Sequence, residues 1–179
     1  MTFIATLKQK RWKKNSSQAF YRVIWTLYNS YRFAFIPAYR SRIIHSLLYK
    51  KEYHQFSNFT KIDRYPDLFE MAKQHFDKIE NPKILSFGCS TGEEVASLSR
   101  YIPYANIVGV DINFWCLKEA HRHFSSKKCT FIHSLSPEFE NMQDFDAIFC
   151  LAVFQHPENR HDKTRIESAY PFEQFEQQL

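Results

Sequence analysis

The chain has 179 residues, of which 44% are hydrophobic and 24% are charged, and its net charge is +5. These proportions are typical of a folded protein and exclude an intrinsically disordered chain, and the length suits one core of about one domain. No apolar run approaches the roughly 18 residues of a membrane-spanning helix. The longest, AIFCLAVF, has the length of a strand.

The four cysteines stand far apart and show none of the paired spacings that a zinc site or a redox dithiol needs. The basic residues near the N-terminus are followed by the polar run NSSQ, whereas a signal peptide continues with an apolar stretch. We therefore expect a reduced, cytoplasmic protein that holds no metal.

The basic segment LKQKRWKKNSS covers residues 7–17 and surrounds a tryptophan. Such a segment suits contact with anionic lipid or with nucleic acid, and it equally suits a solvated tail. The tail is the simpler interpretation. Peripheral membrane contact is kept as a lesser alternative, and nucleic-acid binding is not expected.

Apolar residues recur at three- and four-residue steps through the first 80 residues and predict three helices. The first begins near Ser17, an available N-cap, and the second and third open at Pro37 and Pro66, because proline suits the first helical position. We interpret residues 1–80 as a helical region and residues 81–179 as a separate domain of alternating strands and helices.

After Pro82 the pattern changes to short apolar strands that alternate with helices. The predicted helices run from Glu93 to Tyr101 and from Phe114 to Phe124. The predicted strands are KILSF (83–87), NIVGVD (106–111), CTFIH (129–133) and, with its following turn, FDAIFCLAVF (145–154). This alternation predicts an α/β fold, a Rossmann-like doubly wound parallel sheet of about four strands, whose ligands bind at the carboxyl ends of the strands.

The segment FGCSTGEE joins the first predicted strand to its helix through small residues. Such a turn leaves backbone N–H groups at a helix start beside an open crevice, and its small residues let a ligand come close to the chain. Asp111 ends the next strand about twenty residues later, where a carboxylate can accept hydrogen bonds from ribose hydroxyls. The turn lacks the three glycines of a dinucleotide site, the Gly-Lys-Ser/Thr of a phosphate loop and any basic residue, so it favours S-adenosylmethionine over NAD or ATP.

The motif GCSTGEE, together with VGVDI and FDAIFC, resembles the corresponding motifs of the class I S-adenosylmethionine-dependent methyltransferases. It is most similar to their chemotaxis-receptor (CheR-type, protein-glutamate) branch, which shares CSTGEE. General members have an acid where Ser86 stands and a glycine where Ser90 stands. Upstream, NFTKIDRYP matches the branch's N-x-T-x-x-x-R-x-P segment, with Asp63 in place of the usual aromatic residue.

The resemblance implies a set of cofactor-binding residues. By this resemblance the upstream segment and Glu93 bind the methionine end of the cofactor, Asp111 at the end of the second strand binds the ribose, and the residues after the third strand lie beside the adenine. The full set is Asn58, Thr60, Arg64, Gly88, Cys89, Ser90, Gly92, Glu93, Asp111, Ile112, Ser134, Leu135, Leu151 and Ala152.

Several of these residues also have structural interpretations. Asn58 and Thr60 suit a turn before the Pro66 helix, and Glu93 and Asp111 suit the positive end of a helix dipole. The branch carries Asn-Leu where Ser134 and Leu135 stand, and it carries Arg-Asn at positions 151 and 152.

Methyl transfer needs little acid–base equipment, because the enzyme chiefly aligns the acceptor with the methyl carbon and excludes water. Gln155 and His156 follow the fourth strand and are the nearest candidates to face the acceptor. We assign His156 as the candidate catalytic base, with a loop-capping role before Pro157 as the alternative.

Only four strands can be counted before Leu179, whereas the class I sheet has seven. We therefore expect a C-terminally truncated domain, in which an oligomer contact or a missing segment covers the edge of the fourth strand. Two functions follow: a methyltransferase acting on an unidentified small molecule or protein, or a degenerate methyltransferase-like domain serving as a non-catalytic binding module.

Overall fold

The structure is a computed structural model, and it describes residues 17–49 and 58–153. The chain divides into two compact units, residues 1–40 and 41–179. The boundary falls inside a helix and lies upstream of residue 80.

The described part of the first unit consists of α2 (Ser17–Phe35) and the first turn of α3 (Pro37–Leu48), in agreement with the first two predicted helices. The guanidinium of Arg32 lies 4.0 Å from the ring centroid of Tyr39, and the Tyr39 hydroxyl donates to Asn29 Oδ1 at 3.2 Å. These contacts join the two helices at the Pro37 corner. Among the described helices, none has the length and apolar character needed to cross a membrane.

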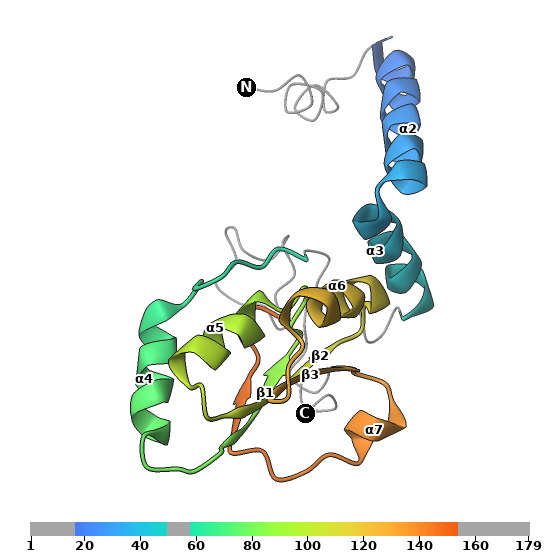
Figure 1. The fold of residues 1–179 in the computed structure, drawn as a ribbon. Helices are drawn as coiled ribbons and strands as arrows, with labels where there is room; N and C mark the ends of the chain where they lie inside the picture. The colour runs from blue at the N-terminus through green and yellow to red at the C-terminus, as the bar shows by residue number, and fades with distance from the viewer. Residues whose placement is uncertain (1–16, 50–57, 154–179) are drawn as a thin grey trace, which may run out of the picture. The chain divides into compact units, whose positions relative to one another are not determined.

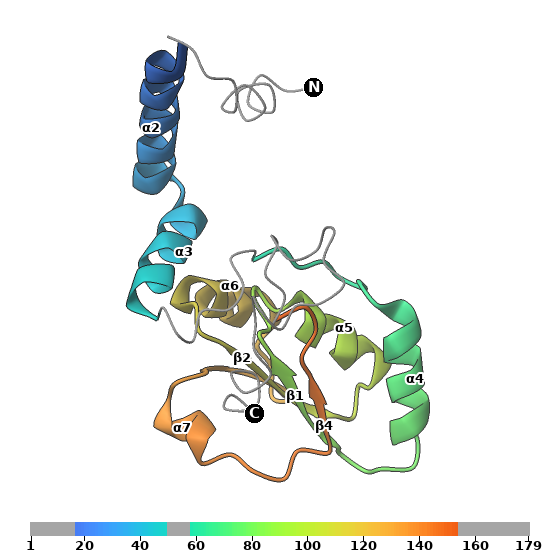
Figure 2. The same ribbon diagram turned by 180° about the vertical axis from the view of Figure 1, so that it is seen from behind.

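The second unit is built on a four-stranded parallel sheet in the order β3-β2-β1-β4 (Figures 1 and 2). Its strands are β1 (Lys83–Phe87), β2 (Asn106–Asp111), β3 (Cys129–His133) and β4 (Ala147–Phe149). The connections place β2 and β3 on one side of β1 and β4 on the other. The prediction of a parallel, Rossmann-like α/β sheet of about four strands is confirmed.

Helices cover one face of this sheet. They are α4 (Pro66–Phe76), α5 (Glu93–Tyr101) and α6 (Phe114–Phe124), all with the predicted starts. Phe69 and Phe76 of α4 are each 1% exposed and pack in the same core cluster as Leu98 of α5 and Ala120 of α6. Because α4 contributes to this core, it belongs to the sheet unit.

The opposite face carries a smaller cluster of Leu85, Val108, Val110 and Ile132. Phe139, from the short helix α7 (Pro137–Glu140), packs against this cluster together with Met142 and Phe145. The sequence analysis did not predict α7, whose four residues are too few to show a helical period. Ser136 caps it by accepting the Phe139 N–H.

The run FDAIFCLAVF was predicted as a strand with its following turn, and its described residues form a short strand. β4 pairs with β1 at Ala147, Ile148 and Phe149. The backbone then leaves the sheet, and Ala152 has a left-handed φ of 62°, a conformation that cannot continue a strand. In the described residues β4 pairs on one side only, and the side chain of Ile148 is 60% exposed.

Candidate cofactor site

The carboxyl ends of β1, β2 and β3 lie together, because the parallel register places Phe87 beside Val110 and Asp111 beside His133. The turn after β1 starts at this edge. The N–H groups of Gly88 and Cys89 both donate to the carbonyl of Val110, at 2.8 and 2.9 Å. The turn after β1 therefore lies beside the end of β2, as predicted.

Three residues of the turn have positive φ: Gly88 (74°), Ser90 (50°) and Gly92 (93°). This region favours glycine, and a serine held there is uncommon. Ser90 is held by its N–H, which donates to Asp111 Oδ2 at 2.8 Å, and by its hydroxyl, which donates to the Asn58 carbonyl at 3.1 Å. Ser90 thus joins three predicted site segments.

Packing within the protein explains why glycine occupies both positions 88 and 92. A Cβ on Gly88 would lie 2.5 Å from Val153 Cγ2, and one on Gly92 would lie 2.9 Å from the Phe124 ring. The sequence analysis explained these glycines by the close approach of a ligand. In the structure the packing of the fold requires them, so the polar groups and not the glycines indicate the site.

Asp111 is the central polar group. Its Oδ2 accepts the Ser90 N–H and its Oδ1 accepts the Asn113 N–H, both at 2.8 Å. Burial raises the pKa of this carboxyl, and these backbone donors partly offset the effect. An ionised carboxylate has about four acceptor positions, so a half-buried Asp111 keeps capacity for a ribose hydroxyl.

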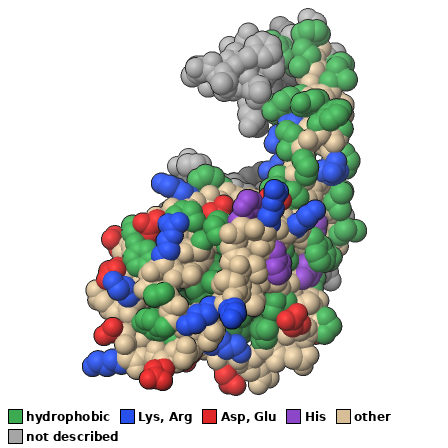
Figure 3. Space-filling view, in the orientation of Figure 1, with side chains coloured by type: hydrophobic (Ala, Val, Ile, Leu, Met, Phe, Trp, Pro, Cys, Tyr) green, Lys and Arg blue, Asp and Glu red, His purple; other side chains and the backbone are tan. Residues whose placement is uncertain are grey.

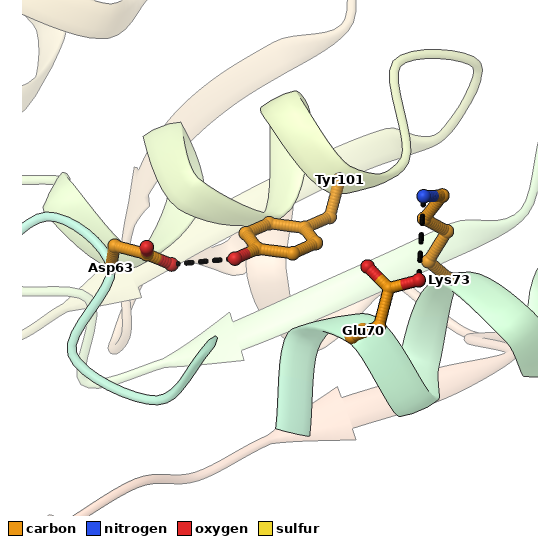
Figure 4. A network of polar contacts seen from close by, with 4 residues as sticks. All are labelled: Asp63, Glu70, Lys73 and Tyr101. Atoms are coloured by element: carbon orange, nitrogen blue, oxygen red, sulfur yellow. Dashed lines mark hydrogen bonds and ion pairs between the residues drawn. The ribbon is translucent and has the colours of Figure 1, made fainter. Parts of the chain in front are cut away.

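The upstream segment is tied to α5 by Asp63, the residue that departs from the branch pattern. The Asp63 N–H donates to Ser97 Oγ at 2.8 Å, and its carboxylate accepts the Tyr101 hydroxyl at 2.9 Å. The hydrogen bond to Asp63 raises the pKa of Tyr101. Figure 4 shows this contact beside the ion pair of Glu70 and Lys73 on α4.

These contacts hold Asn58, Thr60 and Arg64 on the segment leading into α4. Asn58 reaches the turn through its carbonyl, and Thr60 and Arg64 are half-buried. The guanidinium of Arg64 lies 5.1 Å from the Tyr65 ring centroid, and its Nη1 donates to the Phe59 carbonyl at 3.4 Å. Their roles toward a cofactor stay predictions.

The adjacent acids of the turn have different surroundings. Glu93 accepts the Thr91 hydroxyl at 2.7 Å, whereas Glu94 accepts the hydroxyl of the buried Ser86 at 2.8 Å. Burial raises the pKa of Glu94 to about 7, and the Ser86 hydrogen bond and the Arg64 charge oppose that rise. The cofactor role of Glu93 stays a prediction, and Glu94, for which no role was predicted, is the carboxylate that contacts β1.

The ends of β2 and β3 form the predicted adenine side. Ile112 accepts a hydrogen bond from His133 Nε2 at 3.0 Å, and the Ser134 N–H donates to the Asp111 carbonyl at 3.1 Å. Leu135 is 43% exposed. The His133 ring stacks on Phe114 at a centroid distance of 4.0 Å. Ile112, Ser134 and Leu135 are thus grouped near Asp111.

The remaining predicted residues are placed less directly. Cys89 is buried, Leu151 packs against the larger core cluster, and Ala152 is half-buried. Gln155 and His156, the acceptor-side candidates, lie outside the described residues.

Two residues of α3 also support the site, and the sequence analysis did not identify them. The Ser41 hydroxyl donates to Asn113 Oδ1 at 2.6 Å, and His45 Nε2 accepts the Phe114 N–H at 3.3 Å. Asn113 Oδ1 also accepts the Trp115 N–H and caps α6. Only the cap had a sequence signal, an asparagine just before a helix.

The thiols near the site are not activated nucleophiles. Burial raises the pKa of Cys89 well above its ordinary value, and burial raises those of Cys116 to about 12 and Cys150 to about 11. Thiolate is the reactive form of cysteine, so these side chains are inert at neutral pH. None of these three thiols therefore supplies a nucleophile to the site.

We predict that Glu94 makes stability depend on pH. Its folded-state pKa lies above its ordinary value, so the folded protein binds a proton between about pH 4.5 and 7 that the unfolded chain releases. The free energy of unfolding therefore falls as pH rises through this window, by about 2 to 3 kcal/mol. Glu94→Gln should remove that fall in urea unfolding at pH 5 and pH 8.

The exposed Glu80 gives a matched control. Glu80→Gln should keep the parental difference between the two pH values. An unchanged difference in Glu94→Gln would show that Glu94 titrates normally.

A family model matches part of the chain. Residues 84–170 match the model of a methyltransferase domain. The match covers just under half of the chain, from β1 through β4 and beyond, and it agrees with the methyltransferase class predicted from GCSTGEE and VGVDI. It does not distinguish the chemotaxis-receptor branch. No curated protein matches the sequence.

Several solved structures are similar to the chain at low identity. The plantazolicin methyltransferase BpumL in complex with SAH is 17% identical, with a TM-score of 0.42 over 84% of this chain and 51% of that one. Its complex with a monoazolic desmethylPZN analog and SAH gives 16% and 0.40 over 83% and 50%. The YcgJ protein from Bacillus subtilis gives 17% and 0.38 over 50% and 39%. The chain spans about half the length of the BpumL structures.

Proposed function

We propose that the chain is an S-adenosylmethionine-dependent methyltransferase. The methyltransferase-domain match supports the class. The observation that carries the cofactor assignment is the half-buried Asp111 at the end of β2, joined to the turn after β1 by the Ser90 N–H at 2.8 Å. This arrangement supports Asp111 as the ribose acceptor beside the start of α5.

The residues present fit this cofactor. The turn from 88 to 92 contains no basic side chain, so it suits a ligand without phosphate. Asp111 would hold the ribose, Ile112 and Ser134 would border the adenine, and Arg64 would pair with the carboxylate of the methionine end. When bound, S-adenosylmethionine supplies a methyl group already activated on its sulfonium.

The chain's contribution is then binding and alignment. Ser90 and Asn113 orient the Asp111 carboxylate, and Asp63 fixes the Asn58–Arg64 segment on α5. His156 is the proposed base where an acceptor must lose a proton. The acceptor is a small molecule or a protein group.

Within this class we favour the chemotaxis-receptor branch. The shared CSTGEE wording and the spacing of Asn58, Thr60 and Arg64 support it. Leu151 and Ala152 stand where that branch has Arg-Asn, so they favour an acceptor other than a receptor glutamate. The same apolar pair supports the second candidate, a non-catalytic binding module.

Calorimetric titration of the chain with S-adenosylhomocysteine, with NADH as the comparison, tests the cofactor. We expect micromolar binding of S-adenosylhomocysteine and none of NADH, because the turn lacks a phosphate site. A folded chain that binds neither would favour a module that does not use the cofactor.

The same titration tests the branch. Arg64→Ala should weaken S-adenosylhomocysteine about tenfold, because it removes a charge-assisted hydrogen bond. Unchanged affinity would remove the upstream segment from the site and leave the Asp111 assignment intact.

A further inference from the structure

Charge is distributed very unevenly along this chain. The first 51 residues contain 11 of its 24 Lys and Arg residues and none of its 19 Asp and Glu residues. The rest of the chain is therefore acidic overall. A modest net charge of +5 conceals a strongly basic N-terminal segment, which will be attracted to anionic surfaces.

Helix α2 lies within this basic segment and carries an exposed apolar face. Five side chains at three- and four-residue steps have most of their surface exposed. They are Phe20 (66%), Val23 (58%), Leu27 (65%), Tyr31 (57%) and Phe35 (71%). We call this set the α2 stripe. Figure 3 shows hydrophobic side chains at the surface along α2.

The stripe is continuous on one side of the helix. At 1.5 Å per residue it extends about 22 Å from its first to its last member. Residues at this spacing share one face, and the described contacts of Arg32 with Tyr28 and Tyr39 are made outside the stripe. An exposed apolar face of this length indicates a surface that binds something.

We propose that α2, with the basic residues that precede it in the sequence, binds the surface of anionic membranes. The stripe would enter the boundary between headgroups and acyl chains, and the basic residues would contact the acidic headgroups. Arg22 lies on the opposite side of the helix, so its charge would stay in water while the stripe is buried.

The chemistry of the stripe favours lipid over nucleic acid. Basic surfaces that bind single-stranded RNA place aromatic rings where bases stack on them. Val23 and Leu27 lie in the middle of the stripe and offer no ring, whereas aliphatic side chains suit hydrocarbon. The adjacent Lys and Arg residues supply the charge complementarity that anionic lipid requires.

Vesicle co-sedimentation of the full chain tests this inference. We expect at least tenfold tighter binding to phosphatidylcholine vesicles containing 30% phosphatidylserine, about the anionic content of a charged leaflet, than to pure phosphatidylcholine. Leu27→Asp should weaken binding to the anionic vesicles by at least about 30-fold, because it removes apolar insertion and adds a repelled charge.

Thr26→Asp is the matched control, since it adds the same charge at the neighbouring exposed position off the stripe. We expect it to weaken binding by no more than about fivefold, the effect of one charge near the surface. Leu27→Asp should also keep the parental melting temperature and affinity for S-adenosylhomocysteine, which separates this inference from the proposed function.

Three outcomes would overturn the inference. Equal losses for the two variants would mean that charge alone drives binding. Tighter binding to a single-stranded RNA than to the vesicles would assign the basic segment to nucleic acid. A lower melting temperature or a changed oligomeric state for Leu27→Asp, with vesicle binding retained, would mean that protein covers the stripe.

Discussion

Asp111→Asn is expected to weaken S-adenosylhomocysteine binding by about 10- to 100-fold. A hydrogen bond to a charged group contributes about 1.5 to 3 kcal/mol, and each 1.4 kcal/mol is about tenfold in affinity. The substitution removes the charge and turns one acceptor oxygen into a donor. It also places that donor against the N–H of Ser90 or Asn113, which both need an acceptor.

The loss of backbone hydrogen bonds must be separated from the loss of ribose binding. Urea unfolding of Asp111→Asn measures how far the lost backbone hydrogen bonds destabilise the domain, and the titration is made where the variant is fully folded. Asp144→Asn is the control, because it makes the same chemical change at an exposed residue, and its affinity should equal the parent's. An Asp111→Asn variant with parental affinity would falsify the ribose assignment.

Most of the sheet unit could be predicted from the sequence, because its signals are local. β1, α5, β2, α6 and β3 begin and end where the apolar patterns predicted. Strand-length runs alternating with helical periods have few other solutions than parallel strands with crossover helices. The position of Asp111 beside the turn followed from that topology alone.

The end of β4 could not be predicted in the same way. AIFCLAVF is uniformly apolar, but the backbone leaves the sheet after Phe149. Ala152 adopts a positive φ, and Val153 packs over Gly88. An apolar run does not reveal whether its residues pair with a strand or cover a turn. Gly88 and Val153 are 65 positions apart in the sequence, so their contact could not be predicted from local signals.

The polar supports of the site were hidden for a similar reason. The Ser41 contact with Asn113 joins residues 72 positions apart, and the His45 contact with Phe114 joins residues 69 apart. Neither residue type has a spacing that predicts such a partner. The choice between Glu93 and Glu94 likewise depended on how α5 is rotated against β1, which adjacent acids do not indicate.

Gly92→Ala is expected to destabilise the domain by about 3 to 5 kcal/mol. Two costs add: a non-glycine residue held at positive φ costs about 1 to 3 kcal/mol, and overpacking a filled core costs about as much again. Gly92 has a φ of 93°, and a Cβ there would meet the Phe124 ring at 2.9 Å and Ala120 Cβ at 3.0 Å. Urea unfolding measures the loss directly.

Ser90→Gly is the matched control in the same turn. Ser90 has a φ of 50°, so glycine relieves backbone strain there while the hydrogen bond to Asn58 is lost. These effects oppose each other, and the net change should stay within about 1 kcal/mol. Should Gly92→Ala prove as stable as Ser90→Gly, the backbone at position 92 would tolerate a side chain. The glycine would then have to be explained by ligand approach, as the sequence first suggested.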